Sequence, residues 1–101
     1  MGINISQGEH ELFKDSEEFL GENLQLVIAI EEMSELIKVI TKYQRGSYNE
    51  SNFCEELSHV VLMCNQLISM FKIEDGVHEQ YSKAIAKLYR EVEKKKGDLN
   101  E

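Results

Sequence analysis

The chain contains no proline in its 101 residues. Proline is the residue that most readily breaks a helix, because its ring fixes φ and it has no backbone N–H to donate. Apolar residues also recur at intervals of three and four along most of the sequence, which is the spacing of one face of an α-helix. These two features predict an all-α protein with long helices and short connections.

Four helices are expected, at about residues 9–20, 22–44, 53–71 and 76–96. With short connections they favour an antiparallel four-helix bundle, formed by one domain that spans residues 1–101. Ser6 followed by Glu9 is a capping-box pattern before the first helix, and Asn52 followed by Glu55 repeats it before the third. Asp75 can cap the fourth helix.

Apolar stripes suggest which helix faces pack. In the second predicted helix the expected core stripe is Leu26, Ile30, Met33, Ile37 and Ile40. The fourth predicted helix carries a heptad-like stripe made of Val77, Tyr81, Ile85, Leu88 and Val92. A domain of this length buries only about 60–70% of its unfolded surface, so an oligomer would suit it.

The charge balance narrows the classes of partner. The formal net charge is -8 and the sequence pI is about 4.9, which argues against nucleic-acid polymers and anionic membranes. No apolar run approaches the roughly 20 residues that a membrane span needs, and the first residues do not resemble a signal peptide. Cys54 and Cys64 are expected to be reduced thiols, so a cytoplasmic protein is predicted.

Two acidic clusters border these apolar stripes. The first contains Glu31, Glu32 and Glu35, and the second contains Glu56 and His59. Residues three apart share one face of a helix, so two such helices side by side would bring four metal-binding groups together. The simpler interpretation is a pair of solvated faces. Recurrence beside the core favours a cation site instead, because packed carboxylates repel one another unless a cation neutralises them.

These clusters also carry a family resemblance. The run from Gln25 to Arg45 (QLVIAIEEMSELIKVITKYQR), followed by Glu55 to Leu67 (EELSHVVLMCNQL), resembles the MazG-type all-α nucleoside-triphosphate pyrophosphohydrolases. Their hallmark is E-E-x-x-E on one helix and E-x-x-D on the next. The resemblance covers roughly residues 20–92. In this chain the aspartate position of the second half holds His59.

The resemblance implies hydrolysis of a nucleoside triphosphate to the monophosphate and pyrophosphate, with Mg²⁺ as cofactor. It assigns Glu32, Glu35 and Glu56 as metal ligands, with His59 at the fourth position. Glu31 and Glu35 are the expected catalytic residues, Glu31 either as a further ligand or by orienting water. The family also implies an assembly, so a homodimer or homotetramer is predicted.

His59 leaves several alternatives open. Imidazole suits Mn²⁺ or another transition metal better than Mg²⁺. The chain can therefore be a divergent active enzyme, an enzyme with an altered metal preference, or a catalytically weak or inactive helical module that binds nucleotide or mediates assembly. In a simpler interpretation, His59 hydrogen-bonds Glu55 or Glu56 within its own helix. A di-metal carboxylate bundle would need a second Glu-x-x-His, which only a symmetric dimer could supply.

Other side chains are candidates for substrate contacts. Cations near the ends of the predicted helices can reach the phosphates or simply complement a helix dipole, and they are Lys42, Arg45, Lys87 and Arg90. Tyr43, Tyr48 and Phe53 can stack on a base or close a core or an oligomer interface.

Overall fold

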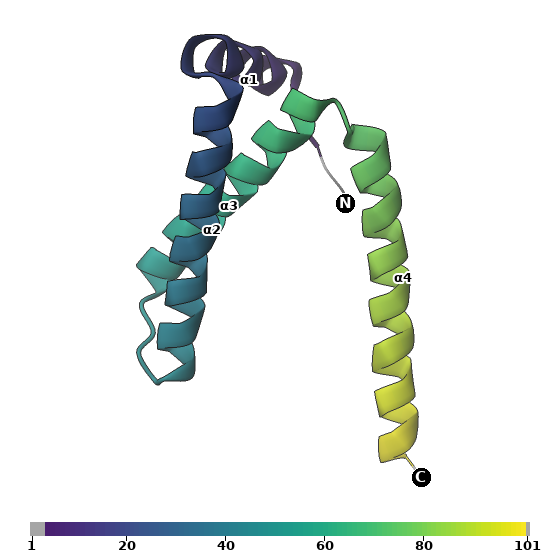
Figure 1. The fold of residues 1–101 in the computed structure, drawn as a ribbon. Coiled ribbons are helices and arrows are strands. Elements are labelled where there is room, and N and C mark those ends of the chain that lie inside the picture. The colour runs from purple at the N-terminus through teal and green to yellow at the C-terminus, as the bar shows by residue number, and fades with distance from the viewer. Residues whose placement is uncertain (1–3, 101) are drawn as a thin grey trace. The chain divides into compact units, whose positions relative to one another are not determined.

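The computed structural model describes residues 4–100, which form four α-helices and no strand. The helices are α1 (Gln7–Leu20), α2 (Glu22–Gln44), α3 (Glu50–Phe71) and α4 (Glu74–Leu99) (Figure 1). The prediction of an all-α protein with four helices is therefore confirmed. The bounds of α2 agree with the predicted range, whereas α1, α3 and α4 begin earlier and α4 also ends later.

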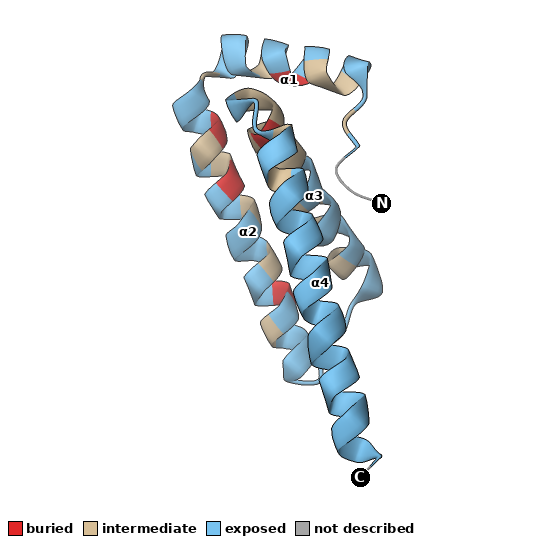
Figure 2. Cartoon of the chain, turned by 90° about the vertical axis from the view of Figure 1, so that its right-hand side faces the viewer, coloured by how far each residue is buried: buried red, intermediate tan, exposed pale blue. Residues whose placement is uncertain are grey.

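The chain separates into two compact units. One contains α1, α2 and α3 and spans Ile5–Lys72, and the other contains α4. In the first unit α2 and α3 lie side by side, and the short segment between them makes them antiparallel (Figure 1). Helix α1 lies across the end of this pair where α2 begins and α3 finishes (Figure 2). A single domain with all four helices in one bundle stays a prediction.

The start of α1 has the predicted capping box. The backbone N–H of Glu9 donates to Oγ of Ser6, and the backbone N–H of Ser6 donates to Oε1 of Glu9, each over 3.1 Å. Gly21 then ends α1 with φ of 86°. Since L-residues rarely adopt this conformation, glycine at this position allows α2 to begin directly after the turn.

The two other predicted caps are wrong. Asn49 is the N-cap of α3, and its Oδ1 accepts from the backbone N–H of Asn52 over 3.0 Å. Asn49 therefore supplies the cap one turn earlier, and Asn52 lies inside the helix. Helix α4 begins at Glu74 after Ile73 and has no side-chain cap, so Asp75 is already in the first turn.

The buried core of the first unit is small. Its buried apolar residues are Phe13, Ala29, Val39, Met63 and Ile68. The predicted core stripe of α2 does not join them: Ile30 is 68% exposed and Ile37 is 64% exposed in the single chain. The side of α2 that is buried carries Ala29 and Val39 (Figure 2). Periodicity correctly found an apolar face, but another face of α2 packs within the first unit.

Polar contacts join α1 to the helix pair. Nε2 of Gln66 donates to Oγ of Ser16 over 2.8 Å and also to Oε1 of the buried Gln25. Nδ1 of His10 lies 2.7 Å from Oγ of Ser69, which is hydrogen-bonding distance. Because buried polar groups are costly unless they are hydrogen-bonded, these contacts specify where α1 crosses α2 and α3.

Replacing the cap of α1 should destabilise the first unit. We expect Ser6→Ala to lower the free energy of unfolding by about 1 kcal/mol, the typical loss when an N-cap hydroxyl is removed. Urea unfolding followed by circular dichroism measures this change. Ser34→Ala, in the middle of α2, is the matched control and should be neutral or slightly stabilising. Equal effects of the two substitutions would contradict the role of the cap.

The same capping box predicts a pH dependence. Hydrogen bonding by the Ser6 backbone, and then by its side chain, holds the pKa of Glu9 below its ordinary value of 4.5. A lowered pKa in the folded state gives stability that is present above 4.5 and is lost as pH falls through the folded-state value. Urea midpoints between neutral and acidic pH should show this loss, and Glu9→Gln should remove the part that Glu9 contributes.

Candidate metal centre

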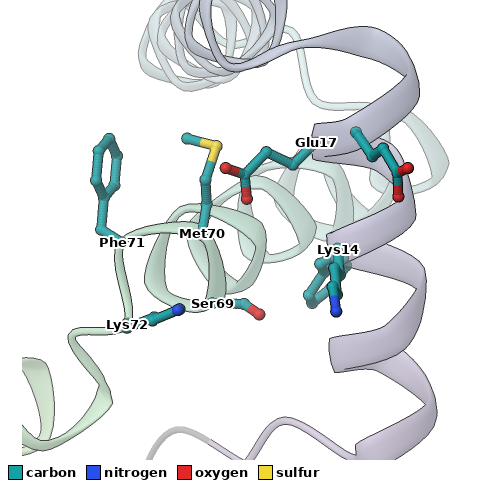
Figure 3. Close-up of a pocket in the computed structure, with 8 residues that line it drawn as sticks. Lys14, Glu17, Ser69, Met70, Phe71 and Lys72 are labelled. Atoms are coloured by element: carbon teal, nitrogen blue, oxygen red, sulfur yellow. The ribbon is translucent and has the colours of Figure 1, made fainter.

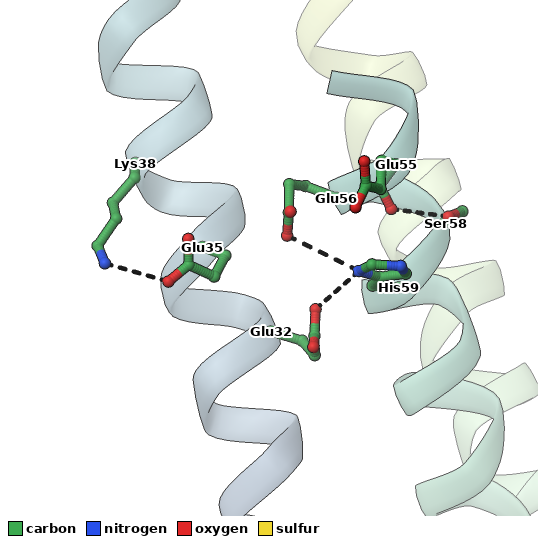
Figure 4. A network of polar contacts seen from close by, with 7 residues as sticks. All are labelled: Glu32, Glu35, Lys38, Glu55, Glu56, Ser58 and His59. Atoms are coloured by element: carbon green, nitrogen blue, oxygen red, sulfur yellow. Dashed lines mark hydrogen bonds and ion pairs between the residues drawn. The ribbon is translucent and has the colours of Figure 1, made fainter. Parts of the chain in front are cut away.

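Three side chains that can bind a metal converge between α2 and α3. They are Glu32 from α2, and Glu56 and His59 from α3 (Figure 4). One ligand atom from each residue lies within 4.8 Å of the other two. The structure therefore brings together three of the four predicted ligands, and they come from both acidic clusters.

The register of the two helices explains this convergence. Glu32 follows the buried Ala29 by three residues and precedes the buried Val39 by seven, so it shares the α3-facing side of α2. On α3, Glu56 precedes the buried Met63 by seven residues. The exposed fractions of the side chains are 13% for Glu56, 27% for Glu32 and 41% for His59. The cluster thus lies at the edge of the packed interface and keeps access to solvent.

His59 links the two helices. Its Nδ1 lies 3.0 Å from Oε2 of Glu32, where an imidazole N–H can donate to the carboxylate, and 4.0 Å from Oε2 of Glu56. The longer separation is beyond hydrogen-bonding range. The hydrogen bond that we considered within α3, from His59 to Glu55 or Glu56, is therefore replaced by one that crosses to α2.

Glu56 has a buried carboxylate oxygen that accepts no hydrogen bond. Its Oε2 is buried, and no residue in the described range 4–100 hydrogen-bonds it. Leaving a buried acceptor unpaired costs about 1–3 kcal/mol, and more when the group is charged. A cation held between Glu32, Glu56 and His59 would give this oxygen a closer positive partner than the His59 ring, whose Nδ1 lies 4.0 Å away. This oxygen is the observation that best fits the cluster to a metal.

The donor set indicates the class of metal. Two carboxylates with one imidazole suit Mn²⁺, Fe²⁺ or Zn²⁺ better than Mg²⁺, which prefers oxygen ligands alone. Ligand atoms bound at about 2.0–2.2 Å from one ion lie roughly 3 Å apart. The His59–Glu32 separation already has this value, whereas Oε2 of Glu56 lies 4.0 Å from Nδ1 of His59.

The remaining acidic candidates lie outside this group. Glu35 is exposed and pairs with Lys38, whose Nζ donates to its Oε1 over 3.1 Å (Figure 4). Glu31 and Glu55 are also exposed. The catalytic roles of Glu31 and Glu35, and the role of Glu35 as a ligand, stay predictions.

Two of the four predicted phosphate contacts belong to the first unit and two belong to α4. Lys42 lines a hollow near the end of α2, and Arg45 follows that helix as its C-cap residue. Lys87 and Arg90 belong to α4, where Nζ of Lys87 pairs with Oε1 of Glu91 over 3.9 Å. No ligand contact defines a role for these cations, so phosphate binding by them stays a prediction.

The aromatic residues form a small cluster near the α2–α3 connection. The rings of Tyr43 and Tyr48 are nearly perpendicular with centroids 5.4 Å apart, and those of Tyr48 and Phe53 lie 5.9 Å apart. Desolvation, with the charge of Glu50 nearby, raises the pKa of Tyr48 above 10.0. Tyr48 is therefore protonated at neutral pH, and its hydroxyl can donate a hydrogen bond.

Two hollows of the first unit have different linings. A hollow of about 860 Å³ between α1 and the end of α3 is lined partly by Phe13, Met70 and Phe71, with Lys14 and Glu17 beside them (Figure 3). A smaller hollow of about 230 Å³ lies between the end of α2 and the start of α3. Asparagines of the connection and of the first turn of α3 line the smaller one. These asparagines were not among the site residues predicted from the sequence, although polar residues cluster there in the run SYNESN between two predicted helices.

Comparison with known proteins does not assign the chain to a family: no family model, curated protein or solved structure matches it. Among residues 4–100, no helix has the length and apolar character needed to cross a membrane.

The cluster predicts selective loss of metal binding. We expect Glu32→Gln and Glu56→Gln to weaken Mn²⁺ binding by at least about tenfold, since even residues that only support ligands are typically worth 10–100-fold. Electron paramagnetic resonance of free Mn²⁺ measures the affinity. Glu55→Gln, which removes the same charge from an exposed position next to Glu56, is the control. Equal losses in all three variants would indicate a general charge effect instead of a site.

Proposed function

We propose that the chain is a metal-dependent pyrophosphohydrolase that converts a nucleoside triphosphate, canonical or modified, to the monophosphate and pyrophosphate. The convergence of Glu32, Glu56 and His59 beside the buried Oε2 of Glu56 carries this proposal. The motif resemblance in α2 and α3 supplies the class of reaction. The acidic surface fits a small substrate whose phosphates arrive with a cation better than it fits a nucleic-acid polymer.

Three residues would hold the metal, and two others would orient the attacking water. Glu32, Glu56 and His59 would hold Mg²⁺ or, in view of the imidazole, Mn²⁺. When bound, such an ion neutralises phosphate charge and makes water more acidic. Glu31 and Glu35, on the exposed side of α2 near Glu32, orient water and accept its proton. Water adds to phosphorus, the phosphoanhydride bond breaks, and pyrophosphate leaves with the bonding electrons.

A second candidate is a nucleotide-binding or assembly module without turnover. The contact between His59 and Glu32 favours it, because Nδ1 of His59 gives Glu32 a hydrogen-bond partner without any metal. An aspartate at position 59 would repel Glu32 and Glu56 unless a cation were present. The histidine thus lowers the need for a cation at the cluster.

Substitution at position 59 separates the two candidates. We expect weak pyrophosphate release from a panel of canonical and modified deoxynucleoside triphosphates with Mg²⁺ or Mn²⁺. Activity with Mg²⁺ should rise by at least about tenfold in His59→Asp, because a third carboxylate suits Mg²⁺ better, and Glu35→Gln should remove it. Glu55→Gln is the control and should retain activity. If neither the wild type nor His59→Asp hydrolyses any nucleotide, the enzyme proposal fails and the module is favoured.

We also propose that the chain is a homodimer or homotetramer. Ile30 and Ile37 are exposed on α2 although they belong to a regular apolar stripe, and α4 contains no buried residue. Contiguous exposed apolar surface of this kind marks an interaction site. A second copy of the chain would present the same stripes, as a symmetric interface requires.

A charge placed on the α2 stripe tests this assembly. We expect Ile37→Glu to weaken self-association by at least about tenfold, because it would bury an unpaired carboxylate in the interface. Sedimentation equilibrium measures the change in mass. Ser51→Glu adds the same charge at an exposed position in the first turn of α3, where the helix dipole favours it, and should leave the mass unchanged. A monomeric wild type would refute the oligomer.

A further inference from the structure

The smaller hollow has a lining that can recognise a heterocyclic ring. We call it the loop hollow, and it is formed by Val39, Lys42, Ser47, Tyr48, Asn49, Asn52 and Phe53. Its volume is about 230 Å³. Pockets for drug-sized ligands measure roughly 300–1,000 Å³, so this hollow fits one small group. This volume exceeds that of a one-ring or a two-ring nucleobase, so either kind of base fits.

The lining has groups that can contact both the flat face and the polar edge of a base. Tyr48 and Phe53 offer aromatic faces on which a flat ring can stack, as unstacked bases do in many nucleic-acid-binding proteins. Asn52 offers an acceptor and two donors to a ring edge. Within the described residues its side-chain amide makes no hydrogen bond. Its backbone N–H donates to Oδ1 of Asn49.

The loop hollow adjoins the candidate metal centre along the same two helices. Asn52 and Glu56 are four residues apart and share a face of α3, about 6 Å apart along the helix axis. On α2, Val39 follows Glu32 by seven residues and is on the same side. A nucleotide with its base in the hollow would therefore have Glu56 about one helical turn away along α3, within reach of its sugar and phosphates.

We propose that the loop hollow is the subsite that binds the base of the nucleotide. Tyr48 and Phe53 supply the stacking surface, and Asn52 hydrogen-bonds the polar edge of the ring. The inference rests on the proposed nucleotide function for its physiological meaning. It makes a separate claim, however, because binding of a base in this hollow needs neither a metal nor hydrolysis.

Binding of monophosphates without metal tests the subsite directly. The ¹⁵N-labelled full chain is titrated with deoxycytidine monophosphate, thymidine monophosphate, deoxyadenosine monophosphate and, separately, inorganic phosphate. We expect the nucleotides of either base class to shift the backbone amides of Tyr48, Asn52 and Phe53. Inorganic phosphate alone should leave those amides unshifted.

Two substitutions in the lining and two control substitutions test whether the nucleotide binds in the loop hollow. Asn52→Ala and Phe53→Leu should each weaken nucleotide binding by at least about fivefold. Phe53→Leu keeps an apolar side chain, and the amide spectrum of each free variant shows whether it is folded. Ser51→Ala, beside Asn52 but outside the lining, should bind as the wild type does. Glu55→Gln, at an exposed position outside the lining, should also bind as the wild type does.

The outcomes separate this inference from the proposed function. Shifts confined to other residues, or the same shifts with inorganic phosphate, would each overturn the base subsite. Neither of these would affect pyrophosphate release. Conversely, nucleotide-dependent shifts at Tyr48 and Asn52 in a protein that hydrolyses no triphosphate would sustain the subsite and refute the enzyme.

Discussion

The packing of α2 against α3 is the constraint on which the candidate sites depend. Ala29 and Val39 on α2 and Met63 on α3 are among the few buried apolar residues of the first unit. Glu32 and Glu56 occupy positions of the same register, so their carboxylates meet where two core side chains would otherwise pack. The metal centre is therefore a polar interruption of an apolar interface, and such an interruption is costly unless something compensates it.

The sequence predicted the helices well because helix formation depends on local properties. The absence of proline and the three-and-four spacing of apolar residues are sufficient to mark long helices, and α2 has the expected bounds. Which face of a helix meets which neighbour depends on contacts far along the chain. Ile30 and Ile37 form a more apolar stripe than Ala29 and Gln25, yet the latter are buried. Periodicity alone cannot distinguish a face that packs within a chain from one available to a partner.

The same limit applies to the site. Spacing of three places Glu32 and Glu35 within about 60° of each other around α2, and this is enough for one to face α3 while the other reaches solvent and Lys38. Glu56 and His59 have the same spacing, but both border the interface because the packed side of α3 lies between them. The hydrogen bond between His59 and Glu32 could not be predicted, since it depends on the relative height of two helices.

His59 is involved both in possible metal binding and in the contact that joins α2 to α3. The Nδ1 atom that now contacts Glu32 is one of only two imidazole nitrogens that could bind a cation, and the Glu32 oxygen it contacts is also a candidate ligand. If Nδ1 is the ligand, a metal must replace the hydrogen bond between them, so the net gain from binding is reduced by the value of that bond. The buried oxygen of Glu56 acts in the opposite direction, because it has no hydrogen bond among the described residues to lose. Whether the cluster favours a bound cation or a metal-free contact between the helices depends on two free energies. One is lost when the hydrogen bond to Glu32 breaks, and the other is gained when a cation binds the buried oxygen of Glu56.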